Sequence, residues 1–333
     1  MTGNFHRKRY LYRVYGLNVS SNIHLPSDEL VGTSTPEVWF RLTTDDKATE
    51  RLPPGAAFIA GRKRRNRWNA PGIFKVGGFY LLRYYEILDL YISEDGQSIR
   101  CYCRPGIAIE HVWGALLGPA FSLILNLREI FNLHGSGVAL NGQAIGFTGP
   151  PGVGKSTLAT CFLRKGASLV TDDVLALREE KGMIYALPAF PAVRIWPETV
   201  AHLIKEDLEL PKVVPEAEKR RLDIDGLCGT FCREPRPLRA IYILEPDENP
   251  SGVAKVQFVP LFKRQAVLAL LMDTFFKIAF SPEIQARCLK FYSRVASQVP
   301  VKRVRFQRSF DLLPSLHSAI LEDLTYERVS LSK

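Results

Sequence analysis

The sequence predicts an α/β protein in which a β-rich N-terminal part precedes a larger part of mixed strands and helices. Runs of β-branched and aromatic residues dominate the first third of the 333 residues. Apolar residues recur at helical spacing from Gly106 onwards, and an apolar strand later runs into a glycine-rich loop and an amphipathic helix. We therefore expect a β-rich domain over residues 1–105 and a second domain over 106–333.

The β-rich part is expected to contain strands at 12–15, 38–42, 79–85, 87–92 and 99–103, with Asp95-Gly96 as a hairpin turn. Beyond Gly106, the apolar spacing predicts one helix from about 109 to 117 and another over 120–131. We also expect a helix over 281–298 and a strand over 301–306.

The composition excludes several classes of protein. Apolar residues make up 46% of the chain and charged residues 23%, which is the balance of a soluble globular protein and not of a disordered tail or a fibre. No apolar run reaches the roughly 20 residues that a membrane-spanning helix needs. The basic first residues lack the apolar segment of a secretory signal. We expect a cytoplasmic protein without membrane association and with reduced cysteines.

The net charge of +10 favours anionic partners such as nucleotides, acidic peptides or nucleic acid. Basic residues gather in two runs, Arg62-Lys63-Arg64-Arg65 and Lys219-Arg220-Arg221. The alternative interpretation of each run is a solvated surface segment without a partner. Since no nucleic-acid-binding motif accompanies them, we do not expect nucleic acid as a partner.

The most specific pattern begins with a predicted hairpin. Strands over 137–140 and 143–148 flank Asn141-Gly142, the pair that a two-residue type I′ turn prefers. The second strand leads into Gly149-Pro-Pro-Gly-Val-Gly-Lys-Ser156, which satisfies the phosphate-loop pattern in full. The helix that follows runs to about Lys165, where Gly166 ends it.

This loop predicts a site for a nucleoside triphosphate and Mg²⁺. Glycines let backbone N–H groups approach phosphate oxygens, Lys155 reaches the β- and γ-phosphates, and the hydroxyl of Ser156 binds the metal. The helix N-terminus adds its dipole. The predicted nucleotide-binding residues are Gly149, Gly152, Val153, Gly154, Lys155, Ser156 and Thr157.

Two carboxylates and one imidazole complete the predicted site. Asp172-Asp173 ends a short strand over 167–171, where the two side chains should point to opposite sides. Asp172 would then face Mg²⁺, and Asp173 would act as general base on an acceptor hydroxyl. His134 precedes the hairpin and would orient the acceptor or stabilise the γ-phosphate. The alternatives are an ordinary Asp turn and a structural histidine.

The stretch from His134-Gly-Ser-Gly-Val-Ala-Leu through GFTGPPGVGKSTLA to Leu169-Val-Thr-Asp-Asp173 resembles the HPr kinase/phosphorylase family. More specifically, it resembles the HPr-kinase-related proteins found beside peptide-modification genes, including lasso peptide kinases. The resemblance implies the kinase core shared with phosphoenolpyruvate carboxykinase, a mixed sheet with flanking helices. It implies ATP and Mg²⁺ as cofactors, phosphate binding by Lys155, metal binding by Ser156, Asp173 as base and His134 as its helper.

The sequence also departs from that family. The glycine-rich signature before the HPr-contacting region and the arginine-bearing C-terminal element of the reverse reaction have no counterpart here. Both absences argue against HPr as substrate and against phosphorolysis. In their place stand Arg194, which would contact the acceptor or the phosphate, and the basic run at 219–221. Surface salt bridges are the alternative for each.

We therefore expect a serine kinase that phosphorylates a ribosomal precursor peptide or a protein, with the N-terminal domain helping to hold it. A kinase for a free amino acid would need the same core. A nucleotide-dependent docking or regulatory protein with little catalysis would need only the phosphate loop. The resemblance is also compatible with a homo-oligomer.

Overall fold

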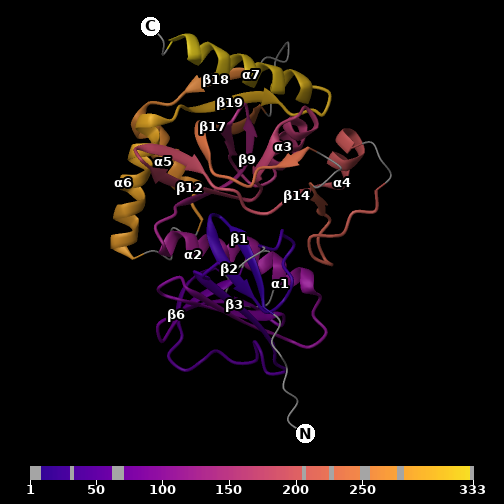
Figure 1. Cartoon of the computed structure of the whole chain (residues 1–333), viewed down its shortest axis with the longest axis vertical. Coiled ribbons are helices and arrows are strands. Elements are labelled where there is room, and N and C mark those ends of the chain that lie inside the picture. Colours follow the sequence, from indigo (N-terminus) through magenta and orange to yellow (C-terminus); the bar gives the residue numbers. More distant parts are fainter. Residues whose placement is uncertain are drawn as a thin grey trace. The chain divides into compact units, whose positions relative to one another are not determined.

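The computed structural model describes residues 9–30, 34–61, 71–204, 208–224, 229–247, 256–275 and 281–330 (Figure 1). The chain forms two compact units. Unit 1 contains Met1–Ile130, Lys212–Ala217 and Phe275–Gln285, and unit 2 contains Phe131–Pro211, Glu218–Thr274 and Ala286–Lys333. The predicted basic run at 62–65 lies outside the described residues.

Unit 1 is built on a sheet of eight described strands in the order β1-β2-β3-β8-β7-β6-β5-β4. All neighbours are antiparallel except β2-β3 and β3-β8, which are parallel. The bounds are β1 (Tyr10–Val14), β2 (Leu17–Ser21), β3 (Val38–Thr44), β4 (Ala57–Gly61), β5 (Gly72–Val76), β6 (Phe79–Tyr84), β7 (Leu88–Ser93) and β8 (Ser98–Cys103).

The strands predicted for the N-terminal part are confirmed as β1, β3, β6, β7 and β8, whereas β2, β4 and β5 were not foreseen. The predicted helix over 109–117 is divided into α1 (Ile109–Ala115) and a π-helical turn, η1 (Leu116–Ala120). Pro119 has no N–H to donate, which disfavours regular α-helical bonding at this point. The next helix, α2 (Phe121–Leu127), ends earlier than expected. These helices belong to unit 1, so its first stretch ends at Ile130 and not near residue 106.

Unit 2 is built on a second sheet, of nine described strands, and a separate two-stranded sheet, β14-β15. The order in the large sheet is β16-β11-β9-β12-β13-β17-β19-β18, and β10 pairs with both β9 and β17. The bounds are β9 (Asn132–Leu140), β10 (Gln143–Thr148), β11 (Ser168–Thr171), β12 (Val174–Glu180), β13 (Met183–Ala186), β14 (Ala192–Ile195), β15 (Arg220–Asp223), β16 (Thr230–Phe231), β17 (Arg236–Asp247), β18 (Gln257–Pro260) and β19 (Val301–Gln307).

The strand before the glycine-rich loop is fixed on both sides. β10 pairs antiparallel with β9 through the Asn141-Gly142 turn, whose φ angles of 50° and 77° confirm the predicted type I′ geometry. On its other side β10 runs parallel to β17, which runs parallel to β19. The carboxyl ends of these three strands therefore lie along one edge of the sheet, where ligands of α/β proteins commonly bind.

The helices of unit 2 are α3 (Lys155–Arg164), α4 (Pro197–Thr199), η2 (Val200–Ile204), α5 (Lys263–Met272), α6 (Pro282–Gln298) and α7 (Leu313–Ser330), the first turn of α6 being grouped with unit 1. Helices α3 and α7 pack on the β10-β17-β19 part of the sheet in a core that includes Phe147, Phe162 and Leu316. The predicted helix over 281–298 and strand over 301–306 are confirmed as α6 and β19. Among the described residues, no helix combines the length and the apolar character needed to cross a membrane.

Candidate active site

The glycine-rich loop and α3 form the base of the site. Gly149, Gly152 and Gly154 all have positive φ angles, of 127°, 81° and 107°. A side chain at Gly149 would also place its Cβ 2.8 Å from the carbonyl oxygen of Leu244 in β17. Glycine is therefore required there both by the backbone turn and by the close approach of the neighbouring strand. The helix ends as predicted, because Gly166 at a φ of 93° closes a Schellman-type cap.

Lys155 starts α3 and folds its side chain back onto the loop. Its ammonium donates hydrogen bonds to the carbonyl oxygens of Gly149 at 2.8 Å and Pro150 at 3.0 Å. The residue is only 7% exposed, and burial lowers the pKa of its ammonium, an effect that Asp273 and Asp172 oppose. The amine is thus held at the centre of the loop, next to the N–H groups that open α3.

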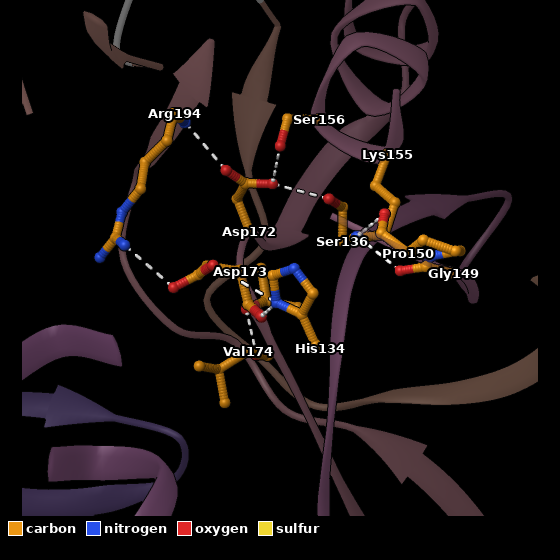
Figure 2. A network of polar contacts seen from close by, with 11 residues as sticks. His134, Ser136, Gly149, Pro150, Lys155, Ser156, Asp172, Asp173, Val174 and Arg194 are labelled. Carbon is orange, nitrogen blue, oxygen red and sulfur yellow. Dashed lines mark hydrogen bonds and ion pairs between the residues drawn. The ribbon is translucent and has the colours of Figure 1, made fainter. Parts of the chain in front are cut away.

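Asp172 accepts hydrogen bonds from three different elements (Figure 2). Its Oδ1 accepts from the hydroxyls of Ser136 in β9 at 2.6 Å and Ser156 in α3 at 2.8 Å. Its Oδ2 accepts from the backbone N–H of Arg194 in β14 at 2.8 Å. The carboxylate therefore links the phosphate-loop helix to two strands, and it places a charged oxygen beside the Ser156 hydroxyl.

Asp173 points away from Asp172, toward the side chains of Arg194 and His134 (Figure 2). Its Oδ2 lies 2.9 Å from Nη1 of Arg194, and its Oδ1 lies 3.5 Å from Nδ1 of His134. The two side chains point to opposite sides as predicted, although the cause is not strand alternation. Asp173 has a φ of 75°, which turns the chain between β11 and β12. Aspartate is among the few residue types that adopt this left-handed conformation readily.

The charges around Asp173 set its protonation and that of His134. Burial favours the neutral acid at Asp173, but the Arg194 guanidinium and then His134 favour the carboxylate more strongly, so its pKa is lowered. Burial lowers the pKa of His134 by more than Asp173 raises it, so the neutral ring is favoured more than in a free histidine. Nδ1 of His134 lies 3.2 Å from the carbonyl oxygen of Asp173, and because a carbonyl only accepts, Nδ1 carries the proton.

His134 lies within β9 and not before it, which corrects its predicted position. β9 starts earlier than expected because its first residues pair with β12, where His134 is opposite Val174. Its remaining residues pair with β10 and β11. One long strand therefore carries both His134 and Ser136 past the phosphate loop, with the two side chains on the same face of the strand.

The small β14-β15 sheet adds the basic side chains of the site. Arg194 and Ile195 in β14 pair with Arg221 and Arg220 in β15, which brings Trp196 and Lys219 together at the end of the ladder. The Lys219 ammonium lies 5.6 Å from the centre of the Trp196 ring. Of the predicted basic run, only Lys219 lines the cleft. Arg220 does not line it, and Arg221 pairs instead with Asp223 at 3.1 Å.

These elements enclose one polar cleft. The predicted residues that line it are Gly152, Gly154, Lys155, Ser156, Thr157, Asp172, Asp173, His134 and Arg194. Gly149 and Val153 do not line it. Gly149 contributes the carbonyl that Lys155 holds, and the N–H of Val153 donates to Pro150 at 3.3 Å.

Sequence reasoning did not identify Ser136 or Arg308, which also line the cleft. Arg308 directly follows β19, at the sheet edge that carries the phosphate loop, so strand order is the signal that would have found it. Ser136 stands two residues after His134 on the same face of β9, and period-two alternation is its only signal.

An apolar pocket of about 450 Å³ adjoins the polar cleft. The two share Gly154, Thr157, Trp196 and Arg308. The rest of the pocket is mainly aromatic and aliphatic, with Phe306, Phe310, Leu313 and Leu316 among its lining residues. Trp196 is 43% exposed, which is unusual for so large an apolar ring, and it stands at the border between the two cavities.

No protein-family model and no curated protein matches this chain. Among solved structures, the chain is similar to the Hpr(Ser) kinase/phosphatase from Coxiella burnetii, with 14% sequence identity and a TM-score of 0.36. The similarity covers 60% of this chain and 95% of that one. It is a distant likeness between the two folds.

Proposed function

We propose that the protein is an ATP- and Mg²⁺-dependent kinase that transfers the γ-phosphoryl group to a serine hydroxyl of a peptide or protein. One observation carries the proposal. A complete phosphate loop shares its cleft with two adjacent carboxylates, one of which contacts the loop serine while the other faces Arg194 and His134. The cleft thus has separate groups for a triphosphate and for an acceptor hydroxyl.

The residues at the first carboxylate fit a magnesium ion. Mg²⁺ prefers hard oxygen ligands and is commonly held by one or two carboxylates together with substrate phosphates. Asp172 Oδ1 and the Ser156 hydroxyl lie 2.8 Å apart, so a carboxylate and a hydroxyl already converge next to the loop. These two residues would hold the ion, which when bound neutralises charge on the phosphate oxygens.

The loop and its lysine would bind the triphosphate. Backbone N–H groups at the start of α3 and the dipole of that helix favour an anion at this point. The Lys155 ammonium now bonds to two carbonyl groups and would exchange them for phosphate oxygens. The adjoining apolar pocket has room for a nucleoside, and Trp196 offers a ring at its border on which a base would stack.

Asp173 would receive the proton of the acceptor hydroxyl. Its lowered pKa makes it a weak base. Phosphoryl transfer passes through a loose transition state, however, so the acceptor hydroxyl needs little activation by a base. Its main contribution is then to orient the hydroxyl. Arg194 would hold Asp173 in place and stabilise charge on the transferring group, and Lys219 and Arg308 add positive charge to the same cleft.

The choice of a peptide or protein acceptor rests on the resemblance of the motif order to HPr-kinase-related peptide kinases. It also fits the net charge of +10, which would attract acidic partners. The cleft itself offers no contact that is specific for a peptide.

The direct test is phosphoryl transfer from γ-labelled ATP by the full chain, with and without Mg²⁺. Acceptors would be a panel of serine-containing peptides, the same peptides with alanine in place of serine, and free serine. We expect a phosphoserine product only with the serine peptides and only with Mg²⁺. Phosphorylation of free serine alone would identify a small-molecule kinase. ATP binding without transfer to any acceptor would indicate a nucleotide-dependent docking protein.

A further inference from the structure

Unit 1 contains a second polar cleft, of about 400 Å³, which the proposed kinase site does not use. It lies over strands β6, β7 and β8, and the loop at 45–51 forms one side of it. The opposite face of these strands carries apolar side chains such as Leu82, Leu90 and Ile99, which are fully buried in the core of the unit. One face of the sheet therefore builds the core, and the other builds the cleft.

The strand register explains which side chains share the cleft face. Arg83 in β6 pairs directly with Asp89 in β7, and Asp89 pairs with Tyr102 in β8. Tyr91 in β7 pairs directly with Arg100 in β8. Directly paired residues of antiparallel strands point to the same face, so these five side chains stand side by side.

Arg83 is charged and buried at the base of this cleft, with only 2% of its surface exposed. Its Nε and Nη2 donate to the two carboxylate oxygens of Asp89 at 2.8 and 2.6 Å, and Nη2 also donates to the carbonyl oxygen of Arg51 at 2.9 Å. Nη1 has no acceptor among the described residues. A guanidinium with one donor group left over, in a cleft, is suited to an oxyanion.

The remaining charges of the cleft are mostly positive. Lys47, Arg51 and Arg100 line it, and none of the three forms an ion pair with a carboxylate of the described residues. Asp89 is neutralised by Arg83, which leaves Asp45 as the one acidic lining residue without a described cation. Three cations against one carboxylate give the cleft a field that attracts anions.

Aromatic rings stand between these cations. Arg100 lies over the Phe79 ring, 5.3 Å from its centre, and the rings of Tyr91 and Tyr102 meet edge to face at 5.6 Å. Such rings offer flat apolar surface together with a hydroxyl, a combination enriched where proteins bind other chains. The cleft is also much larger than one carboxylate or phosphate needs.

From these contacts we propose that the unit 1 cleft binds an acidic peptide segment, with a Glu or Asp carboxylate at Arg83 and Arg100 and an apolar side chain against Phe79 and Tyr91. An extended peptide presents every second side chain to the same face, so an acidic residue and an apolar residue two positions apart can both reach this lining. The proposal concerns unit 1 alone and does not depend on the proposed kinase activity.

The test measures the binding of two labelled octapeptides to the full chain without nucleotide. Binding is monitored by fluorescence anisotropy at about 50 mM salt, where screening of charges is weak. One peptide repeats Glu-Ser-Phe-Ser, so that Glu and Phe share a face when the chain is extended, and the other has Gln at every Glu. We expect the acidic peptide to bind about tenfold more tightly, since a charge-assisted hydrogen bond is roughly twice as strong as a neutral one. Hydrogen exchange should slow at 45–51 when it binds.

Exposed side chains provide variants that leave the fold intact. Arg100→Gln should weaken binding of the acidic peptide about tenfold, and Lys47→Gln about threefold. Arg13→Gln, which removes the same charge from an exposed residue of β1 outside the cleft, is the matched control and should have almost no effect. Equal affinity for the two peptides, or equal losses in Arg100→Gln and Arg13→Gln, would overturn the proposal. Displacement of the peptide by millimolar inorganic phosphate would assign the cleft to a small free anion instead.

Discussion

The two polar clefts of this protein are built in different ways. In the unit 2 cleft, most of the important side chains come from a few short and continuous segments, such as the phosphate loop and Asp172-Asp173. In the unit 1 cleft, the lining residues come from four strands, the loop at 45–51 and the turn at Gly77, spaced along residues 45–102. The first cleft is organised by backbone turns, and the second by the register of a sheet.

This difference determines how easily each cleft can be recognised from the sequence. A loop that presents consecutive N–H groups needs glycines at fixed positions, and these leave a recognisable pattern. A cleft on a sheet face needs only every second residue of each strand, and Arg83, Asp89 and Arg100 look like ordinary surface charges until their pairing is known. Substitutions in the unit 2 cleft should therefore change mainly activity, and substitutions in the unit 1 cleft mainly stability. Five predictions test this difference.

The largest effect is expected in the phosphate loop. Lys155→Ala should reduce phosphoryl transfer at least about a thousandfold, because it removes a charge that acts on the transition state. Steady-state kinetics measures the loss. Lys165→Ala, at the exposed end of α3, is the matched control and should keep normal activity. Near-normal turnover in Lys155→Ala would refute the assignment of the loop.

Substitutions of the two adjacent carboxylates should have different effects. Asp173→Asn should lower transfer by about 10²–10³-fold and leave ATP affinity intact, because it removes only the base and its charge. Asp172→Asn should instead raise the Mg²⁺ concentration needed for half-maximal activity. It should also cost stability, since one amide oxygen cannot satisfy the three donors that Asp172 accepts now. Metal titrations of both variants measure the separation, and identical curves would contradict it.

In unit 1 the largest effect should be on stability. Arg83→Met leaves Asp89 as a buried carboxylate without its partner and should lower the free energy of unfolding by about 3–5 kcal/mol. Arg83→Met/Asp89→Leu removes both charges and should recover most of this loss. Urea denaturation measures both variants. A double variant as unstable as the single one would mean that packing, and not charge, accounts for the loss.

The apolar pocket beside the phosphate loop should affect nucleotide affinity alone. Trp196→Ala should raise KM for ATP about tenfold with little change in kcat, because base stacking is worth about 1–3 kcal/mol. Trp39→Ala is a matched control, since Trp39 is equally exposed, at 43%, but lies in unit 1. If KM stays unchanged in Trp196→Ala, the base does not lie against this ring.

The smallest effect concerns pH. The pKa of His134 is lowered in the folded protein, so between that pKa and about 6.5 the unfolded chain binds more protons. Stability therefore rises with pH through this window and is lost as the pH falls through it. His134→Asn should reduce this slope in urea titrations at pH 5.5 and 7, by at most about 1.4 kcal/mol per tenfold difference in proton affinity.

Much of the unit 2 cleft could be predicted from the sequence, because it depends on local conformation. The phosphate loop, its flanking strand and helix, and the Asn141-Gly142 turn each depend on residues within a few positions of one another. His134 was expected before its strand, since nothing local shows that β9 continues to pair with β12. The second role of Asp172, as acceptor for Ser136 and for the Arg194 N–H, likewise depends on distant strands.

The extent of unit 1 was harder to predict. The change from strand-like to helical spacing near residue 106 suggested a boundary, but α1, η1 and α2 belong to the unit that holds the first sheet. A change in periodicity marks a change of element, whereas a boundary depends on where buried side chains pack, as Phe121 does beside Tyr15. β4 and β5 were missed because their apolar residues do not alternate clearly, and β2 because only Leu17 and Val19 of its five residues are apolar.

The parallel ladder β10-β17-β19 has a consequence for how the chain reaches its folded state. All the described strands of unit 1's sheet have been synthesised once Cys103 has been added to the chain. In unit 2, β10 can pair with β17 only after Asp247 has been synthesised, and β17 can pair with β19 only after Gln307. Contacts between segments so distant in sequence form slowly. The glycine-rich loop is synthesised before the middle of the chain, yet β19 and Arg308, which lie at the same edge of the sheet, are synthesised near the end of translation. A nascent chain would therefore complete the cleft of unit 1 before the cleft of unit 2.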